Sequence, residues 1–251
     1  MSLKCKTIVI AAGGEGKRLK GYFDKVDYKD TKVLYPINGK PLLQHVIETA
    51  LAAGMERIFV LTKHDAESVA NFLHDKYGKD ERVGIFPGSQ DMTISAELLS
   101  LEEKLTEPFV YADGNILYSP SLLKSIIGQT CESLATITIS EKDYAPTHLS
   151  VLIDNTGNIS NIGTRLAQRT SLQNEDAHQY CSLGVMYFSP QIFTLMKQHE
   201  DISDLDYLIE HLYNDTGHKN SLSYFIYDNE WSGLHVAEDI KKMEEYVKTY
   251  S

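Results

Sequence analysis

Residues 8–19, with the sequence IVIAAGGEGKRL, join a run of apolar β-formers directly to a glycine-rich, cationic segment. Because Gly13, Gly14 and Gly16 lack a Cβ atom, their backbone can adopt positive φ and bring N–H groups close to an anion. A lysine and Arg18 then add full positive charges. The stretch therefore predicts a buried strand that ends in a phosphate-binding loop. The alternative is a tight strand-to-helix turn with a solvated Lys-Arg pair.

Several known phosphate-binding motifs do not fit this loop. A Walker-type loop requires G-x-x-x-x-G-K-[ST], yet Gly16 and Lys17 are followed by Arg18. The dinucleotide fingerprint G-x-G-x-x-G fails as well, since Leu19 stands where the third glycine would be. The chain carries no GxSxG elbow, HExxH pair or kinase catalytic-loop triplet either. These classes of nucleotide-binding and catalytic site are therefore excluded.

The composition restricts the partners of the chain. Its 251 residues carry a formal charge of −11, whereas binding a nucleic acid requires a dense cationic surface, so no nucleic-acid partner is expected. No apolar run reaches the roughly 20 residues needed to cross a bilayer, so no membrane partner is expected either. The three widely spaced cysteines indicate neither a disulfide framework nor a zinc site. A cytoplasmic location is expected.

The first half of the chain alternates short β-branched runs with amphipathic stretches, which is typical of a sheet built from βα units. A helix is predicted over 41–54, with proline at its start and glycine at its end, and further strands over 57–64, 82–87 and 108–114. Open α/β sheets bind ligands at the carboxyl ends of their parallel strands. Residues 20–30 lack convincing periodicity and are a candidate mobile loop.

From about residue 133 the pattern changes. The stretches SLATITIS, LSVLIDNTGNISNI and SLGVMYFS read as strands, and the D-N-T-G turn within the second predicts antiparallel pairing. The predicted fold class is therefore α/β, with a mostly parallel central sheet and a small antiparallel cap.

Two longer stretches carry a family resemblance. AAGGEGKRL, and then a lysine followed by LYPINGKPLLQHVIETALAAGMERIFVLT, resemble the nucleotidylyltransferases that join an NTP to a sugar 1-phosphate. The resemblance implies a Rossmann-like three-layer sandwich of the nucleotidyltransferase or GT-A-like kind. It also implies that the glycine loop and an arginine hold the triphosphate, and that a lysine contacts the phosphates. On this chain the resemblance assigns nucleotide binding to Ala12, Gly13, Gly14 and Gly16, and catalytic roles to Arg18 and Lys32.

The sequence departs from the family pattern at the lysine. Thr31 precedes Lys32, where the family usually has a proline, and the spacing from Arg18 to Lys32 is longer than usual because of residues 20–30. Further along, FVYADGNIL resembles the family strand that ends in Gly-Asp, which implies that Asp113 is a ligand of Mg²⁺.

The substrate-contacting positions depart more strongly. The family's base-contacting Gly-Thr-Ala turn falls on Met92, Thr93 and Ile94, which assigns Thr93 to nucleotide binding. The remaining matches imply substrate-binding residues, namely Thr164 and Arg165 at the family's Glu-Lys pair and Ser182 at a sugar-contacting asparagine. The family's second metal carboxylate falls on Gly233.

The resemblance implies an enzyme that forms an NDP-sugar and releases pyrophosphate. Its partners would be an NTP and a phosphorylated small molecule such as a sugar 1-phosphate, and a homo-oligomer is possible. A single domain over 1–251 is expected, with a nucleotide-binding half at 1–130 and a sugar-phosphate-binding half at 131–251. Two alternatives stay open: a glycosyltransferase that uses Asp113-x-Asn115 as its metal motif, and a degenerate nucleotide-binding regulatory protein. The sequence names neither the base nor the sugar.

Overall fold

The computed structural model describes residues 5–89, 91–128, 133–141, 149–164, 177–214 and 217–250. The chain forms two compact units, which are described separately. The glycine-loop unit consists of Lys4–Met92, Phe109–Gln129 and Asn229–Ser251. The mixed-sheet unit consists mainly of Thr93–Pro108 and Thr130–Asp228.

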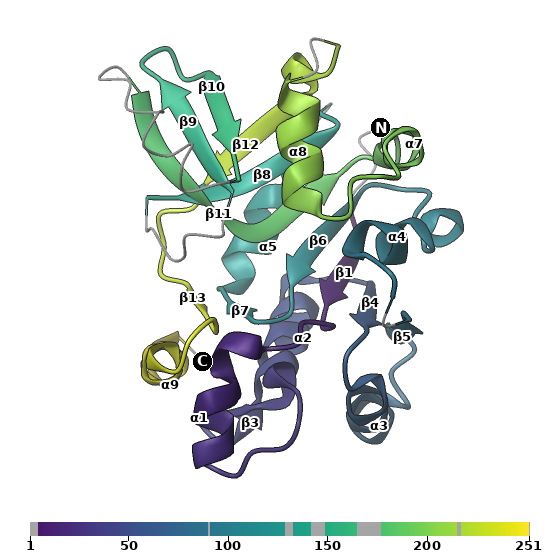
Figure 1. The fold of residues 1–251 in the computed structure, drawn as a ribbon, viewed down its shortest axis with the longest axis vertical. Coiled ribbons are helices and arrows are strands. Elements are labelled where there is room, and N and C mark those ends of the chain that lie inside the picture. Colours follow the sequence, from purple (N-terminus) through teal and green to yellow (C-terminus); the bar gives the residue numbers. More distant parts are fainter. Residues whose placement is uncertain are drawn as a thin grey trace. The chain divides into compact units, whose positions relative to one another are not determined.

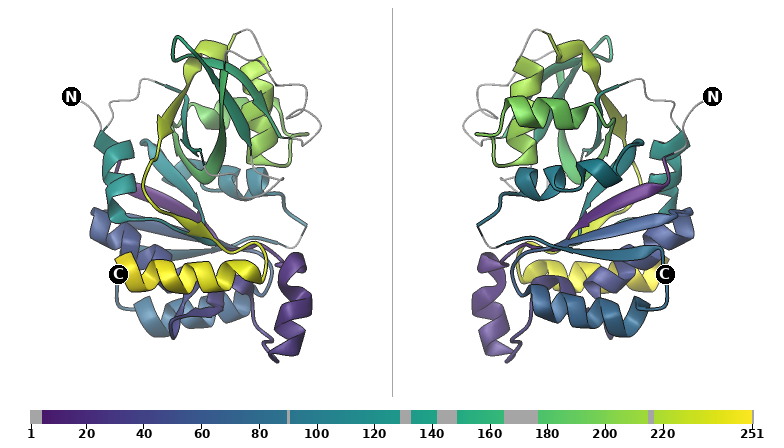
Figure 2. Two further views of the ribbon diagram at one scale, coloured as in Figure 1. Left: turned by 90° about the vertical axis from the view of Figure 1, so that its left-hand side faces the viewer. Right: turned by 90° about the vertical axis from the view of Figure 1, so that its right-hand side faces the viewer.

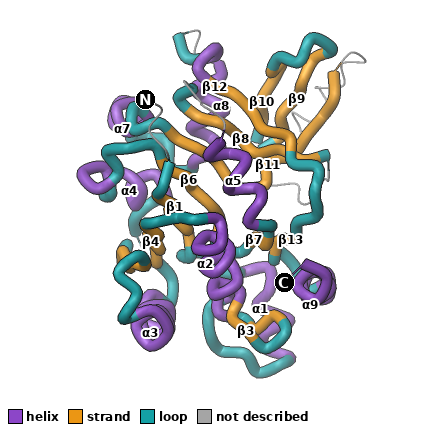
Figure 3. The backbone as a smooth tube through the Cα atoms, turned by 180° about the vertical axis from the view of Figure 1, so that it is seen from behind, coloured by secondary structure: helices purple, strands orange, loops and turns teal. Residues whose placement is uncertain are grey.

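The glycine-loop unit is built on parallel strands in the order β6-β1-β4-β5 (Figure 1), and β6, β1 and β4 are labelled again in the view from behind in Figure 3. Their bounds are Thr7–Ala11 for β1, Arg57–Thr62 for β4, Val83–Pro87 for β5 and Phe109–Asp113 for β6. Ile8, Val9 and Ile10 of β1 are fully buried, as expected for a central strand with neighbours on both sides. The register places Ala11 beside Asp113 of β6, so the glycine loop and Asp113 leave the sheet at the same edge. The predicted parallel sheet is confirmed.

Helices and short elements complete this unit. The helices are α1 (Lys20–Lys25), α2 (Leu42–Ala53), α3 (Ala66–Tyr77), α5 (Pro120–Gly128) and α9 (Glu238–Tyr250). The short elements are η1 (Lys17–Leu19), η2 (Lys32–Leu34), β2 (Pro36–Ile37), β3 (Lys40–Pro41), β7 (Ile116–Leu117) and β13 (Ser232–Gly233). Helix α2 packs on α5, α3 packs on β4 and β5, and α9, yellow in Figure 2, packs on β2 and β13. Gly54, at φ 93°, ends α2 as predicted.

Residues 20–30 differ from the predicted loop, because their first six residues form α1. This helix is short and buries only Phe23 among its residues. One buried position in two turns produces no apolar periodicity, so the sequence pattern could not indicate the helix.

The mixed-sheet unit holds strands in the order β10-β9-β11-β8-β12. Their bounds are Ala135–Ser140 for β8, Ser150–Asp154 for β9, Ile159–Gly163 for β10, Ala177–Phe188 for β11 and Leu222–Ile226 for β12. Only the β8–β12 pair is parallel among these pairings, so the predicted antiparallel pairing is confirmed. In the D-N-T-G turn, Asp154 Oδ1 accepts hydrogen bonds from the Thr156 and Asn158 amides, and Gly157 has φ 82°.

The helices of this unit are α4 (Ile94–Leu99), α7 (Ile192–Gln198) and α8 (Leu205–Asn214), with 3₁₀ turns η3 (Glu102–Lys104) and η4 (Lys219–Ser221). Helix α8 packs on β10, and α4 packs on α7. Across both units, none of the helices that the structure describes is long and apolar enough to cross a membrane.

Candidate nucleotide and metal site

Each glycine of the loop after β1 meets a different structural requirement. Gly16 alone of the three has φ in the left-handed region, at 66°. A Cβ atom on Gly13 would lie 2.6 Å from the Cβ of Lys63, and one on Gly14 would lie 3.0 Å from Lys32 Cε. The predicted positive φ is therefore confirmed only at Gly16, while Gly13 and Gly14 allow lysine side chains to approach the backbone closely.

Lys32 lies over the glycine loop. It begins the 3₁₀ turn η2, and a Cβ atom on Gly14 would lie 3.2 Å from its Nζ atom. Burial lowers the pKa of Lys32, the Asp113 carboxylate opposes that shift, and the guanidinium of Arg18 adds to it. Arg18 itself is exposed in η1. The structure thus brings Arg18, the other predicted catalytic cation, and Asp113, the predicted metal ligand, within electrostatic reach of Lys32.

Asp113 ends β6 next to the start of the glycine loop. The Tyr111 hydroxyl donates a hydrogen bond to Asp113 Oδ1 at 3.0 Å, and the Gly114 amide donates to the Ala11 carbonyl at 2.9 Å. Ala12 is fully buried, and its amide donates to Leu61 of β4 at 2.8 Å. These backbone bonds fix the beginning of the loop relative to the Asp113 carboxylate.

Replacing Gly114 by alanine is expected to lower the free energy of unfolding by about 1–3 kcal/mol, the usual cost of overpacking. The added Cβ would lie 2.8 Å from the Ala11 carbonyl oxygen, a backbone atom that cannot rotate away. Urea denaturation measures the effect. Gly128→Ala is the matched control, because a Cβ there meets nothing within 4 Å. Equal stabilities for the two variants would contradict the prediction.

Gly233 lies beside the turn that follows Asp113. Its strand β13 pairs with β7, while the Asn115 side-chain amide donates to the Leu234 carbonyl at 3.1 Å. A Cβ atom on Gly233 would lie 2.6 Å from His235 Nε2, so the imidazole fills the space that a carboxylate side chain here would need. Among the described residues, no group of three or more His, Cys, Asp or Glu side chains is placed to hold a metal.

Two other predicted contact residues have structural partners in the mixed-sheet unit. Thr93 is the N-cap of α4, where its hydroxyl accepts a hydrogen bond from the Ala96 amide at 3.1 Å. Ser182 is buried in β11, and its hydroxyl oxygen accepts from the Gly184 amide at 3.1 Å. These bonds give both side chains a role in the fold of this unit.

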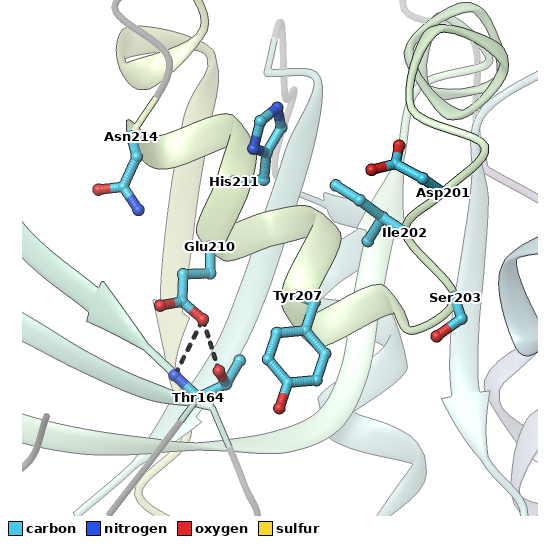
Figure 4. A pocket seen from close by; sticks show the side chains of 8 residues that line it. All are labelled: Thr164, Asp201, Ile202, Ser203, Tyr207, Glu210, His211 and Asn214. Atoms are coloured by element: carbon cyan, nitrogen blue, oxygen red, sulfur yellow. Dashed lines mark hydrogen bonds between the residues drawn. The ribbon is translucent and has the colours of Figure 1, made fainter. Parts of the chain in front are cut away.

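Thr164 lines a pocket of the mixed-sheet unit, with a cavity volume of about 450 Å³ (Figure 4). Its hydroxyl and its amide both donate to Glu210 Oε2 of α8, and the Tyr207 ring lies beside them. The full lining is Thr164, Asp201, Ile202, Ser203, Tyr207, Glu210, His211 and Asn214. Arg165, the other half of the predicted pair, lies outside the described residues.

Lys63 lies near the glycine loop and was not among the predicted site residues. It follows the end of β4, packs against Gly13, and donates from Nζ to the Met92 carbonyl. Its position immediately after a buried parallel strand could have indicated it as a site residue, because the carboxyl ends of such strands share one edge of the sheet.

Comparisons with known proteins identify relatives of this chain. Residues 8–85 match the family described as the MobA-like NTP transferase domain. The bifunctional protein GlmU of Exiguobacterium sibiricum is 31% identical over 159 residues, which is 61% of this chain and 33% of that protein. The chain spans about a third of the length of the curated relatives it matches.

Solved structures resemble nearly the whole chain. The inositol-1-phosphate CTP transferase from T. maritima has a TM-score of 0.77 at 19% identity, covering 99% of this chain and 98% of that chain. A UDP-glucose pyrophosphorylase complexed with UDP-glucose has a TM-score of 0.73 at 16% identity, covering 98% of this chain and 100% of that one. At these identities the likeness establishes the fold alone, and it confirms the predicted α/β fold class.

Proposed function

We propose that this chain is a sugar-1-phosphate nucleotidylyltransferase, which joins an NTP to a phosphorylated small molecule and releases pyrophosphate; the match of residues 8–85 to the MobA-like NTP transferase domain and the likeness to GlmU support this. The first choice for the acceptor is a sugar 1-phosphate, and the product is then an NDP-sugar. The observation that carries the proposal is the position of Lys32, whose ammonium group lies against Gly14 in the glycine loop, with Arg18 and Asp113 within electrostatic reach.

The reaction requires positioning and charge neutralisation rather than a covalent nucleophile. A phosphate oxygen of the acceptor attacks the α-phosphorus of the NTP, a new P–O bond forms, and the bond to the β-phosphate oxygen breaks. The electron pair of that bond leaves with pyrophosphate. Arg18 can donate two hydrogen bonds to phosphate oxygens, and Lys32 acts as a point charge against the phosphates. The glycine loop offers its backbone N–H groups to the same anion.

Asp113 suits a magnesium ion that is held mainly by substrate. Mg²⁺ is commonly bound through one or two carboxylates together with phosphates and water, and the Asp113 carboxylate is positioned by Tyr111 at the edge where the glycine loop begins. When bound there, Mg²⁺ would neutralise charge on the phosphates. His235 fills the space beside Gly233, so we assign only Asp113 as a protein ligand.

The remaining assignments are part of the same proposal. Thr93 would contact the nucleotide, and Thr164, Arg165 and Ser182 would contact the phosphorylated substrate. The division into a nucleotide-binding half at 1–130 and a sugar-phosphate-binding half at 131–251 follows from them. We also propose a cytoplasmic location and leave the base and the acceptor to the experiment below.

A matrix of four NTPs against phosphorylated acceptors, with Mg²⁺ and with pyrophosphate release as readout, tests the proposal. The acceptors include sugar 1-phosphates, alditol phosphates and choline phosphate. We expect pyrophosphate release with one NTP and one class of acceptor. Consumption of an NDP-sugar without pyrophosphate would favour a glycosyltransferase instead. NTP binding without turnover for any acceptor would favour a regulatory nucleotide-binding protein.

A further inference from the structure

The turn that presents Lys32 is held by a tyrosine from the segment just before it. The Tyr28 hydroxyl donates to the Thr31 carbonyl oxygen at 3.0 Å, and the Leu34 amide donates to the same oxygen at 3.0 Å. The Thr31 amide donates to Asp30 Oδ1 at 2.7 Å. Burial raises the pKa of Tyr28, so its hydroxyl stays protonated and can donate. The residue before Lys32 is thus bonded on both its amide and its carbonyl.

Aromatic rings fix the other end of the same turn. The Tyr35 amide donates to the Lys32 carbonyl at 3.2 Å and so closes η2. The Tyr35 ring stacks on Phe23, with ring centroids 5.2 Å apart, and meets the edge of Tyr28 at 5.0 Å. Phe23 and Tyr28 are also 5.0 Å apart. Tyr28 therefore contacts the turn on both sides of Lys32, by a hydrogen bond before it and by ring packing after it.

The backbone at Thr31 adopts the conformation that proline prefers. Its φ is −69° and its ψ is 150°, and proline fixes φ near −65°. Thr31 has no ring to restrict φ, so its conformation depends on neighbouring bonds. The Thr31 carbonyl oxygen accepts the hydrogen bond from the Tyr28 hydroxyl, and the same oxygen accepts the first amide hydrogen bond of η2, from Leu34.

We propose that Tyr28 is a positioning residue that holds the Thr31–Tyr35 turn, and through it holds Lys32 against Gly14 in the glycine loop. The contacts described above support the first part of this proposal, that Tyr28 holds the turn in place. The effect on turnover rests on the proposed function, in which Lys32 contacts the phosphates.

Tyr28→Phe tests the proposal, because it removes the hydroxyl and keeps the ring. Hydrogen exchange of the full chain reads the turn through the amides of Leu34 and Tyr35, which bond to Thr31 and Lys32. Loss of one hydrogen bond corresponds to about fivefold faster exchange there, and to a kcat about fivefold lower with KM nearly unchanged. Tyr22→Phe is the matched control, since the Tyr22 hydroxyl bonds to the Tyr35 hydroxyl and not to the backbone of the turn.

A rescue variant separates positioning from a general loss of structure. Thr31→Pro suits the observed φ; it removes the amide bond to the exposed Asp30 side chain and replaces the buried threonine side chain. In the Tyr28→Phe background it is expected to restore both slow exchange at Leu34 and kcat. A variant that had only weakened the fold would show a lower unfolding temperature and faster exchange throughout the glycine-loop unit, and not only at Leu34 and Tyr35.

The outcomes distinguish the two levels of the proposal. Unchanged exchange at Leu34 and Tyr35 in Tyr28→Phe would overturn the positioning role, whatever the enzyme assay shows. Faster exchange with undiminished kcat would overturn its link to catalysis. Faster exchange, rescued by Thr31→Pro, in a protein that turns over no NTP would support the positioning role and count against the proposed function alone.

Discussion

Lys32→Ala is expected to lower turnover by about a hundredfold or more, since losing one electrostatic contact to developing charge typically costs about 2.7–4 kcal/mol. The fold is expected to survive, because burial lowers the pKa of Lys32 and its removal relieves that desolvation. Initial rates of pyrophosphate release, together with the midpoint of urea unfolding, measure the two effects.

Lys29→Ala is the matched control for this loss. Lys29 belongs to the same segment, but it is exposed and pairs with Asp27 at 2.8 Å. Its removal changes net charge equally without touching the glycine loop, and turnover is expected to stay within about twofold of wild type because exposed ion pairs contribute little. Turnover in Lys32→Ala equal to that of Lys29→Ala would contradict the assignment of Lys32.

Much of the glycine-loop unit could be predicted from the sequence, because its elements carry local signals. Ile8 to Ala12 form an apolar run too short for a helix, and Gly13 follows it directly. The helix that ends at Gly54 has a continuous apolar face and a left-handed cap. Asp113 follows a buried run, so a parallel sheet places it at the same edge as the loop.

The rest of the site depends on contacts between residues far apart in the chain. Nothing around Gly13 or Gly14 indicates that lysines from other segments pack against them. Nor does the local pattern at Gly233 show that His235 folds back over it. Tyr28 is similar, since its bond to Thr31 is local but its packing depends on Phe23 and Tyr35. Such contacts are set by the tertiary fold, which a single sequence pattern does not encode.

Asp113→Asn is expected to weaken NTP binding and lower turnover when magnesium is present, but not to weaken NTP binding when magnesium is absent. With Mg²⁺, turnover should fall by about a hundredfold or more, because the carboxylate that we assign to the metal is lost. With a chelator, NTP should bind as well as to wild type or more tightly, because a negative charge near the phosphates has been removed. Asparagine keeps an oxygen that can accept the Tyr111 hydroxyl bond, so the fold should be preserved. Calorimetric titration in both buffers measures NTP binding, and initial rates of pyrophosphate release with Mg²⁺ measure turnover.

Asp27→Asn controls for the change in net charge. Asp27 is exposed and pairs with Lys29. Asp27→Asn should therefore bind NTP with the same affinity as wild type in each of the two buffers. Asp113 is also the negative charge that opposes the effect of burial on the pKa of Lys32, so its removal lowers that pKa further. Lower affinity of Asp113→Asn in the chelating buffer would mean that the carboxylate acts mainly by keeping Lys32 charged. An equal loss in both buffers would therefore refute the metal-ligand role and leave Asp113 as a partner of Lys32.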